Sequence, residues 1–315
     1  MNHRSDKIMA KRAWSWNLNA ADTKFTEIGH WLSDVRAHVQ RRAPELMGVF
    51  DAYAGEAVHG RQYIDGALAT LPRGADLLEV GAGALLLSSQ LAREGFRVTA
   101  LEPIGPGFSH FEQLRDLVLE LSHMRGHSPT LLPVPAEQLG MVDCVDLAFS
   151  LNVMEHVEDV PRVLNTVARS LKVGGKYRFT CPNYLFPYEP HFNIFTFFSK
   201  GLTARMRPQK IFGRTDIQDA SELWRTLNWI TVSEVVDAIS NHPDLEIHFN
   251  RRYLVSTVER IGSDAQFSAR HAGPLNVFLH ALLRTRLHRM LVMVPSAMQP
   301  LMDCTVFKRA KPRSS

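Results

Sequence analysis

The chain has 315 residues, 45% of them hydrophobic and 22% charged, which is ordinary for a globular protein and allows one large domain with additions. The net charge of +4 is too weak by itself to indicate binding to nucleic acid, and three scattered cysteines without a CxxC pair exclude a cysteine zinc motif and fit a reducing compartment. No apolar run approaches the roughly 20 residues that span a bilayer, and residues 1–11 lack the apolar core of a signal peptide, so we expect a soluble, cytoplasmic protein.

The N-terminal part is predicted to be helical. Between residues 25 and 63 the apolar side chains recur at steps of three and four, as in Ile28, Trp31, Leu32, Val35 and Val39. Pro44 is placed to start a second helix, and a third is expected over 63–71. We therefore expect residues 1–70 to form a helical extension ahead of the main domain.

Strands and helices then alternate up to residue 182. Strand patterns cover 75–80, 96–101, 130–134, 145–151 and 177–181. Helical patterns cover 85–93, 108–125 and 161–171. Gly174 and Gly175 are placed to stop the last of these helices. The alternation predicts an α/β fold, with a mostly parallel sheet covered by helices on both faces.

The regular alternation ends at Pro182. Residues 184–220 combine aromatic, proline and basic residues, which favours a packed lid. Further patterns predict a helix, a strand, a second helix and a last strand over 221–239, 245–253, 275–292 and 303–308. We expect one domain over 71–310, with a substrate lid inserted at about 184–245.

The most informative stretch is Glu79-Val80-Gly81-Ala82-Gly83, which joins the first predicted strand to a helix. Glycine allows a tight turn and lets a ligand approach the main chain, and the start of the helix offers unpaired N–H groups. A dinucleotide fingerprint needs a third glycine where this chain has Leu86, and there is no GxxxxGK[ST] phosphate loop. The turn is therefore predicted to hold a ligand without phosphate groups.

Further candidate residues follow the ends of the other predicted strands. Glu102, before Pro103, ends the second strand and is placed to accept hydrogen bonds from ribose hydroxyls. Ala136 and Glu137 follow the third strand, and Ser150-Leu151-Asn152 follows the fourth. Ligands of an open parallel sheet bind beyond the carboxyl ends of its strands, so these residues predict a nucleoside pocket.

Five stretches in this order resemble class I S-adenosylmethionine-dependent methyltransferases: the E-V-G-A-G turn, an acid ending the second strand, A-E-Q-L after the third, S-L-N-V-M-E-H-V after the fourth, and S-L-K-V-G-G-K-Y-R-F-T before the fifth. The late D-C-T-V-F-K-R-A is similar to the antiparallel closing strand of that family. The resemblance covers about residues 70–182 and the last strand. It implies a Rossmann-like, seven-stranded, doubly wound sheet with an antiparallel last strand.

The same resemblance implies S-adenosylmethionine as methyl donor, with S-adenosylhomocysteine as product. The glycine turn would lie against the methionine part, Glu102 would hold both ribose hydroxyls, the pair after the third strand would flank the adenine, and the residues after the fourth would lie below the sulfonium. Arg61 would pair with the cofactor carboxylate. The implied cofactor-binding residues are Glu79, Gly81, Ala82, Gly83, Glu102, Pro103, Ala136, Glu137, Ser150, Leu151, Asn152 and Arg61.

The run Asn152-Val153-Met154-Glu155-His156 allows two interpretations. Methyltransferases that modify the 3′-terminal ribose of small RNAs carry Glu-x-x-Glu-His here as metal ligands, with another histidine later, and ubiquinone-pathway O-methyltransferases look similar at this point. This chain has Asn152 in place of the first Glu, no other metal signature, and His191 as the distant candidate partner. We favour a polar, hydrogen-bonded start of a helix under the cofactor, and we expect no metal.

The candidate catalytic and substrate residues come from this run and from the lid. Histidine titrates near neutrality, so His156 and His191 are candidate bases for an acceptor hydroxyl, with a structural loop histidine as an equal alternative for His191. Tyr188, Phe192 and Asn193 are the candidate substrate residues, although the aromatics of the lid also fit a core of its own.

Two basic stretches in the second half of the chain are further candidate binding surfaces. Residues 205–214 fit an anionic acceptor, and 275–294 fit a peripheral membrane contact. A solvated face and a helix packed on the sheet explain them more simply.

The sequence thus predicts an S-adenosylmethionine-dependent methyltransferase acting by O- or N-methylation on a small-molecule, glycan or lipid-linked acceptor. Direct displacement from a sulfonium needs little covalent help, so alignment of the acceptor supplies much of the rate. The alternatives are an RNA ribose 2′-O-methyltransferase, although we expect no nucleic-acid partner, and a non-catalytic binding protein of the same fold.

Overall fold

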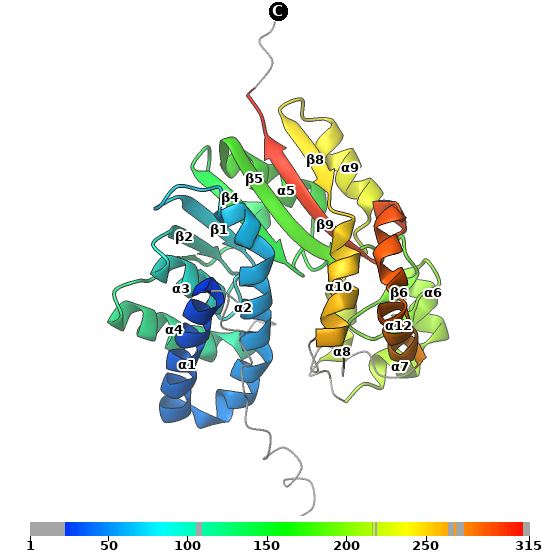
Figure 1. Cartoon of the computed structure of the whole chain (residues 1–315), viewed down its shortest axis with the longest axis horizontal. Helices are drawn as coiled ribbons and strands as arrows, with labels where there is room; N and C mark the ends of the chain where they lie inside the picture. The colour runs from blue at the N-terminus through cyan, green and yellow to red at the C-terminus, as the bar shows by residue number, and fades with distance from the viewer. Residues whose placement is uncertain are drawn as a thin grey trace, which may run out of the picture.

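The computed structural model describes residues 23–104, 109–215, 217, 219–263, 268 and 274–310, and a seven-stranded sheet forms its centre (Figure 1). The strands run in the order β3-β2-β1-β4-β5-β9-β8, and neighbours pair in parallel except β9, which is antiparallel to both β5 and β8. The bounds are β1 Asp76–Val80, β2 Arg97–Leu101, β3 Thr130–Leu132, β4 Val145–Leu151, β5 Leu171–Pro182, β8 Leu245–Phe249 and β9 Leu301–Lys308. The predicted sheet with an antiparallel last strand is confirmed.

Successive residues of the central strands face opposite sides of this sheet. Leu77 and Phe149 belong to one apolar cluster, whereas Leu78 and Ala148 belong to the other. Because side chains alternate along a strand, a continuous apolar run indicates a strand buried on both faces. The first cluster includes α1 Thr23–Arg42, α2 Met47–Leu68, α3 Leu86–Arg93 and α4 Ser109–Met124, and the second includes α5 Val160–Ser170 and α9 Val232–Ser240.

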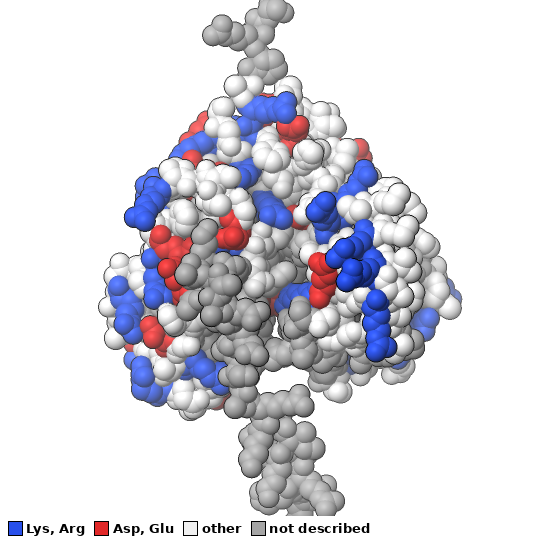
Figure 2. All heavy atoms as spheres, viewed as in Figure 1, with Lys and Arg blue, Asp and Glu red and all other residues white. Residues whose placement is uncertain are grey.

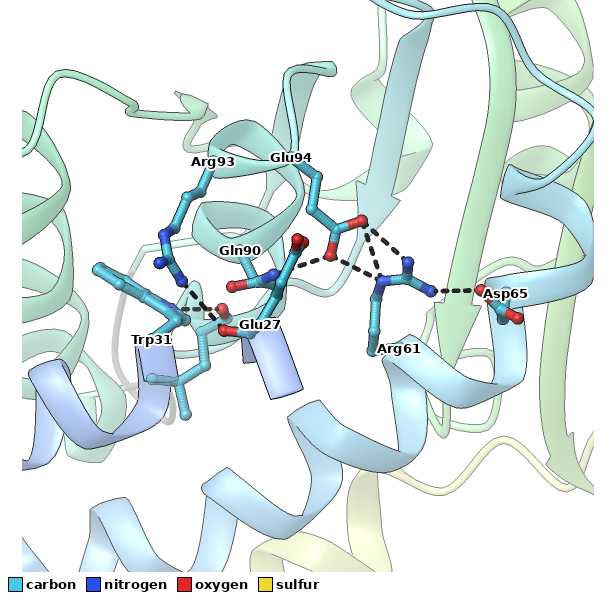
Figure 3. Close-up of polar contacts among 8 residues, drawn as sticks. Glu27, Trp31, Arg61, Asp65, Gln90, Arg93 and Glu94 are labelled. Atoms are coloured by element: carbon cyan, nitrogen blue, oxygen red, sulfur yellow. Dashed lines mark hydrogen bonds and ion pairs between the residues drawn. The ribbon is translucent and has the colours of Figure 1, made fainter. Parts of the chain in front are cut away.

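The N-terminal helices pack on α3, the helix that follows the glycine turn. The indole Nε1 of Trp31 in α1 donates a hydrogen bond to the carbonyl oxygen of Leu86 at 3.0 Å, and Arg93 Nη1 donates to the carbonyl oxygen of Glu27 at 3.0 Å (Figure 3). These bonds join α1 to both ends of α3. The N-terminal extension therefore supports the element on which the turn is built.

One helix, α2, replaces the two that the sequence predicts between 47 and 71. Ala57, Arg61, Ile64 and Leu68 are buried and follow one helical face at steps of four, three and four. The apolar face thus continues through the predicted break, so the helix does too. Pro44 starts a short 3-10 turn, η1 Pro44–Leu46, between α1 and α2.

The fifth strand is longer than predicted. α5 ends at Ser170, and β5 starts at Leu171 and includes Gly174 and Gly175, which the sequence places at the end of a helix. The pairing of β4 with β5 shifts register between Val145 and Leu147, and Gly174 has φ +86°. The two glycines therefore serve an irregularity at the start of the strand, where a positive φ favours glycine.

The lid contains a hairpin and two short helices that the sequence did not reveal: β6 Tyr188–Glu189 pairs with β7 Ile194–Phe195, and α6 Lys200–Met206 and α7 Pro208–Phe212 follow. The single helix predicted over 221–239 is two helices, α8 Ala220–Thr226 and α9. Phe192 and Trp224 are buried with ring centroids 5.5 Å apart, and Tyr184 stacks on Trp229 at 5.0 Å. The aromatics of the lid therefore largely form its own core, joined to the α5 and α9 side of the sheet.

A second group of helices lies between β8 and β9. β8 ends at Phe249, and α10 Arg252–Ser263 begins where the sequence predicts the end of a strand. α12 Pro274–Arg284 and the 3-10 helix η3 Leu287–Met293 pack on α10 rather than on the sheet, and η4 Ser296–Met298 precedes β9. Within the described residues, no helix combines the length and apolar character needed to cross a membrane.

Candidate active site

The carboxyl ends of β4 and β5 point toward the space between α2 and α10 (Figure 1). On the face shown in Figure 2, the surface is recessed beside the part that carries α10. This is the edge at which ligands of open α/β sheets bind.

The glycine turn is fastened to the end of β2. Gly81 has φ +73° and Gly83 has φ +51°. The N–H groups of Gly81 and Ala82 both donate to the carbonyl oxygen of Leu101, at 2.8 and 3.1 Å. The N–H of Gly83 donates to Glu102 Oε2 at 2.8 Å. Two predicted site elements, the turn and the acid ending the second strand, are therefore in direct contact.

The segment that follows β4 packs on the same turn. A Cβ atom added to Gly81 would lie 2.4 Å from Val153 Cγ2, well inside van der Waals contact. Only a residue without a side chain fits here, in both backbone conformation and space. The run from Asn152 to His156 thus begins directly beside the glycine turn.

Two acids beside the turn, Glu79 and Glu102, have raised pKa values. Glu79 is buried and accepts a short hydrogen bond from the Ser88 hydroxyl. Burial, with a smaller contribution from the charge of Glu102, raises the pKa of Glu79 to about 8. Burial also raises the pKa of Glu102, although the N–H of Gly83 and the charge of Arg115 favour its ionised form.

Replacement of Glu79 by glutamine is expected to change how stability depends on pH. The pKa of about 8 lies above the ordinary glutamate value of 4.5, so the folded state keeps a proton that the unfolded state loses. The contribution of this proton to the free energy of unfolding is complete below pH 4.5 and declines as the pH rises to 8. Because glutamine cannot ionise, the free energy of unfolding of Glu79→Gln should rise relative to that of the wild type by a few kcal/mol across this interval, as measured by urea unfolding. Parallel curves for the two proteins would contradict the assignment.

Among the predicted residues after β3 and β4, Ala136 and Ser150 are buried, and the side chains of Glu137 and Ser150 have partners within the chain. Ala136 is buried in η2 Ala136–Gln138, and Glu137 Oε1 accepts from the N–H groups of Glu158 and Asp159 at 2.9 and 3.3 Å. Ser150 is buried and its hydroxyl shares a 2.9 Å hydrogen bond with the Tyr177 hydroxyl, so only its main chain remains for a ligand.

The end of β4 and the residue after Glu102 are more accessible. Asn152 is exposed with φ +54°, its N–H donates to the carbonyl of Thr180 at 2.9 Å, and Leu151 is half-buried. Pro103 is also half-buried. These three residues are thus available to a ligand at the carboxyl edge.

Arg61 has other partners than the one the sequence predicts. Its guanidinium forms a bidentate pair with Glu94, at 2.8 and 2.9 Å, and Nη1 donates to Asp65 at 3.0 Å (Figure 3). The side chain is buried, so two carboxylates of its own chain satisfy it. Arg61 joins α2 to the end of α3, and the structure gives no support to a pairing with the cofactor carboxylate.

Glu155 and His156, at the end of the run after β4, lie close to His191 of the lid. One ligand atom from each lies within 4.8 Å of the others. The imidazole rings have centroids 5.4 Å apart, and His191 Nε2 is 3.9 Å from Glu155 Oε1. The distant partnership between His191 and the run after β4 is thus present in the structure.

The hydrogen bonding of this cluster differs from the prediction. Glu155 is completely buried, and in the part of the chain that the structure describes neither carboxylate oxygen has a hydrogen-bond partner. The sequence favours a hydrogen-bonded start of a helix at this point, and for the Glu155 side chain that is wrong. Burial raises its pKa to about 7 and, with the charge of His191, lowers the pKa of His156 to about 4.

A residue without a predicted role orients His191. His191 Nδ1 lies 2.6 Å from Glu189 Oε1, and Glu189 Oε2 accepts the N–H of Phe192 at 2.7 Å. Burial opposes protonation of His191, but the hydrogen bond and charge of Glu189 outweigh it and raise the pKa of His191. The spacing of Glu189 and His191 by two residues next to a strand is the signal from which this pairing could be found.

The three predicted substrate residues do not act alike. Phe192 is 2% exposed and packs on Trp224, so its side chain belongs to the core of the lid and not to a substrate surface. The Tyr188 hydroxyl donates to Asn193 Oδ1 at 2.9 Å, and Asn193 is exposed with φ +52°. Tyr188 and Asn193 remain available to an acceptor from the hairpin.

In comparison with known proteins, residues 78–179 match the model of a family described as a methyltransferase domain. Over 279 residues the chain is 46% identical to an uncharacterized protein of Mycobacterium tuberculosis, which covers 89% of this chain and 94% of that protein. Over 175 residues it is 31% identical to a ubiquinone biosynthesis O-methyltransferase of Caulobacter vibrioides, covering 53% of this chain and 64% of that one.

Among solved structures, phosphoethanolamine N-methyltransferase 2 of Haemonchus contortus in complex with S-adenosyl-L-methionine is similar with a TM-score of 0.46 and 15% identity; this covers 81% of the present chain and 53% of the other. The chain belongs to one family with the M. tuberculosis protein. With its methyltransferase domain and the order of its sheet, it is a class I methyltransferase that uses S-adenosylmethionine as methyl donor.

Proposed function

We propose that this class I methyltransferase transfers the methyl group to a hydroxyl oxygen of a small-molecule, glycan or lipid-linked acceptor. The observation that carries the proposal is the cluster of Glu155, His156 and His191, which follows directly on the contact between Val153 and Gly81. A hydroxyl is a poor nucleophile until its proton is removed or its oxygen is polarised, and such a cluster beside the donor serves this need. An amine acceptor would not require it.

The donor would lie along the strand ends. The turn from Gly81 to Gly83 would contact the methionine part, with Glu79 fixing the turn from below through Ser88. Glu102 would hold the ribose hydroxyls, with Pro103 beside it. Ala136 and Glu137 would flank the adenine, and the main chain of Ser150, Leu151 and Asn152 would face the sulfonium.

Methyl transfer from the sulfonium would proceed by direct displacement. The acceptor oxygen forms the new bond to carbon as the carbon–sulfur bond breaks, and its proton passes to water at the partly exposed cluster of Glu155, His156 and His191. Alignment of the acceptor provides much of the rate. The lid over 184–245, with Tyr188 and Asn193, would position the acceptor and exclude water.

Two further observations support the acceptor chemistry and the compartment. The C. vibrioides relative is an O-methyltransferase by name, and its match covers 53% of this chain. All three cysteines are free, and Cys181 and Cys304 are buried, which suits a reducing cytoplasm.

Calorimetric titration with S-adenosylmethionine tests the donor site. We expect Glu102→Gln to weaken binding roughly 10- to 150-fold, because loss of a hydrogen bond to a buried charged group costs about 1.5–3 kcal/mol. Glu120→Gln, which removes a carboxylate of α4 that pairs with Arg42 and lies 3.9 Å from His38, is the matched control and should bind like the wild type. Undiminished binding by Glu102→Gln would remove Glu102 from the site.

The acceptor is tested with isotopically labelled donor. Candidate acceptors are phenols, sugars, their amine analogues and a short RNA with a free 3′-terminal ribose. Transfer to a hydroxyl compound and not to its amine analogue is the expected result. Transfer to amines alone would overturn O-methylation, transfer to the RNA alone would replace the small acceptor by the RNA ribose, and donor binding without any transfer would favour a non-catalytic protein.

A further inference from the structure

We propose that Glu155, His156 and His191 bind one divalent transition-metal ion, which coordinates the acceptor oxygen. The binding of the ion is argued from these side chains alone, and its role toward the acceptor rests on the proposed O-methylation. The sequence favours a site without metal, but the fold brings one ligand atom of each of the three side chains within 4.8 Å of the others.

The three groups are close to the spacing that one ion requires. Their ligand atoms all lie within 4.8 Å of one another, and His191 Nε2 and Glu155 Oε1 are 3.9 Å apart. Bonds of about 2.0–2.2 Å to a common ion place neighbouring ligand atoms roughly 3–3.5 Å apart. A contraction of about 1 Å, within the reach of small side-chain rotations, would therefore complete the site.

Glu155 provides an independent indication that a cation is needed. Its carboxylate is completely buried, yet neither oxygen accepts a hydrogen bond from any of the described residues. Buried polar groups are nearly always satisfied, and a buried carboxylate without any donor is costly. A metal ion at this position would satisfy both oxygens at once.

The histidines present the nitrogen atoms that such an ion uses. His191 Nδ1 is 2.6 Å from Glu189 Oε1, so its proton lies on Nδ1 and the lone pair of Nε2 faces Glu155. Metal-binding histidines commonly donate their second N–H to a carboxylate in this way. The Thr226 hydroxyl donates to the carbonyl of Leu223 at 3.0 Å and lies 3.5 Å from His156 Nδ1, which favours the same tautomer for His156.

The lid holds the ligand-bearing turn in place. The Asn228 side chain donates to the carbonyl oxygens of Met154 and Val157 at 2.7 and 2.9 Å, and its N–H donates to the carbonyl oxygen of Glu155 at 2.8 Å. Glu189 is likewise held by the N–H of Phe192. The ligands therefore sit on a supported framework, as metal sites require.

The donor set indicates both the class of metal and its use. Two imidazoles with one carboxylate suit Zn²⁺, Mn²⁺, Fe²⁺ or Co²⁺ better than Mg²⁺ or Ca²⁺, which prefer oxygen ligands. Three protein ligands leave at least one coordination position open, and the His191 side chain is 25% exposed. An acceptor hydroxyl in that position would lose its proton more easily, beside the turn that holds the donor.

The competing explanation is a proton in place of the metal, with charged His191 between Glu189 and Glu155. Metal-free protein prepared by dialysis against a chelator distinguishes the two when it is titrated with ZnCl₂ by calorimetry, and with CoCl₂ by visible absorption, in the absence of donor and acceptor. We expect one ion per chain. His191→Ala and Glu155→Gln should each weaken binding at least about 100-fold, and Glu189→Gln, a positioning residue, about 10- to 100-fold.

His248→Ala, which removes an exposed histidine of β8, is the matched control and should bind like the wild type. Donor calorimetry on the same preparations shows whether each variant is folded. Absence of a stoichiometric ion in the wild type, or equal binding by all variants that still bind donor, would overturn the metal site and leave the proposed methylation standing. Failure of methyl transfer by protein that binds the ion would overturn the proposed function and leave the metal site.

Discussion

Gly81→Ala is expected to weaken binding of S-adenosylmethionine by at least about 30-fold. The added Cβ would lie 2.4 Å from Val153 Cγ2 and 2.9 Å from Cγ1, so either the turn or the segment after β4 must move. Overpacking of this kind costs about 1–3 kcal/mol, and the φ of +73° adds about 1–2 kcal/mol of backbone strain for any residue with a side chain. Calorimetric titration with the donor measures the loss.

A matched control separates backbone strain from the clash. Gly126 has φ +74°, and no neighbouring atom of the described residues lies within 4 Å of an added Cβ, so Gly126→Ala should lose about the same stability from strain and keep donor binding. Adding Val153→Ala to Gly81→Ala removes both clashing methyl groups and should recover part of the affinity. Wild-type affinity in Gly81→Ala alone would show that the turn does not seat the donor.

The elements around this turn could be predicted from sequence because their signals are local. The apolar run before Glu79, the glycines at 81 and 83, and the acid at Glu102 each mark the end of a strand within a few residues. The sheet then brings such ends together by topology alone, since parallel strands share a carboxyl edge. The hydrogen bond from Gly83 to Glu102 is the consequence.

The rest could not be predicted because it depends on contacts between distant segments. Nothing near Arg61 in sequence reveals Glu94, 33 residues later, as its partner. Phe192 carries the same aromatic signal whether it lines a substrate site or packs on Trp224. The pairing of Glu189 with His191 needs the hairpin, and the hairpin strands are two residues each, too short for a periodic pattern.

The largest loss of stability is expected from Asp303→Ala. Asp303 in β9 is 2% exposed and accepts four hydrogen bonds, from the Tyr63 hydroxyl at 2.6 Å, from Arg178 Nε and Nη2 at 3.1 and 2.7 Å, and from Asn250 Nδ2 at 2.8 Å. It thereby joins α2, β5, β9 and the end of β8. Removal of one partner of a buried ion pair leaves an uncompensated charge, here on Arg178, and costs about 3–5 kcal/mol.

Urea unfolding followed by circular dichroism measures this change. Asp303→Asn keeps the shape and part of the hydrogen bonding but not the charge, so its loss should fall between those of wild type and Asp303→Ala. Glu222→Ala, which breaks an exposed pair with Arg225, should leave the free energy of unfolding almost unchanged, because exposed ion pairs contribute little. If Asp303→Ala were as stable as Glu222→Ala, the network would not hold the N-terminal extension to the sheet, and α2 would have to be retained by the apolar packing of residues such as Ile64 and Leu68 alone.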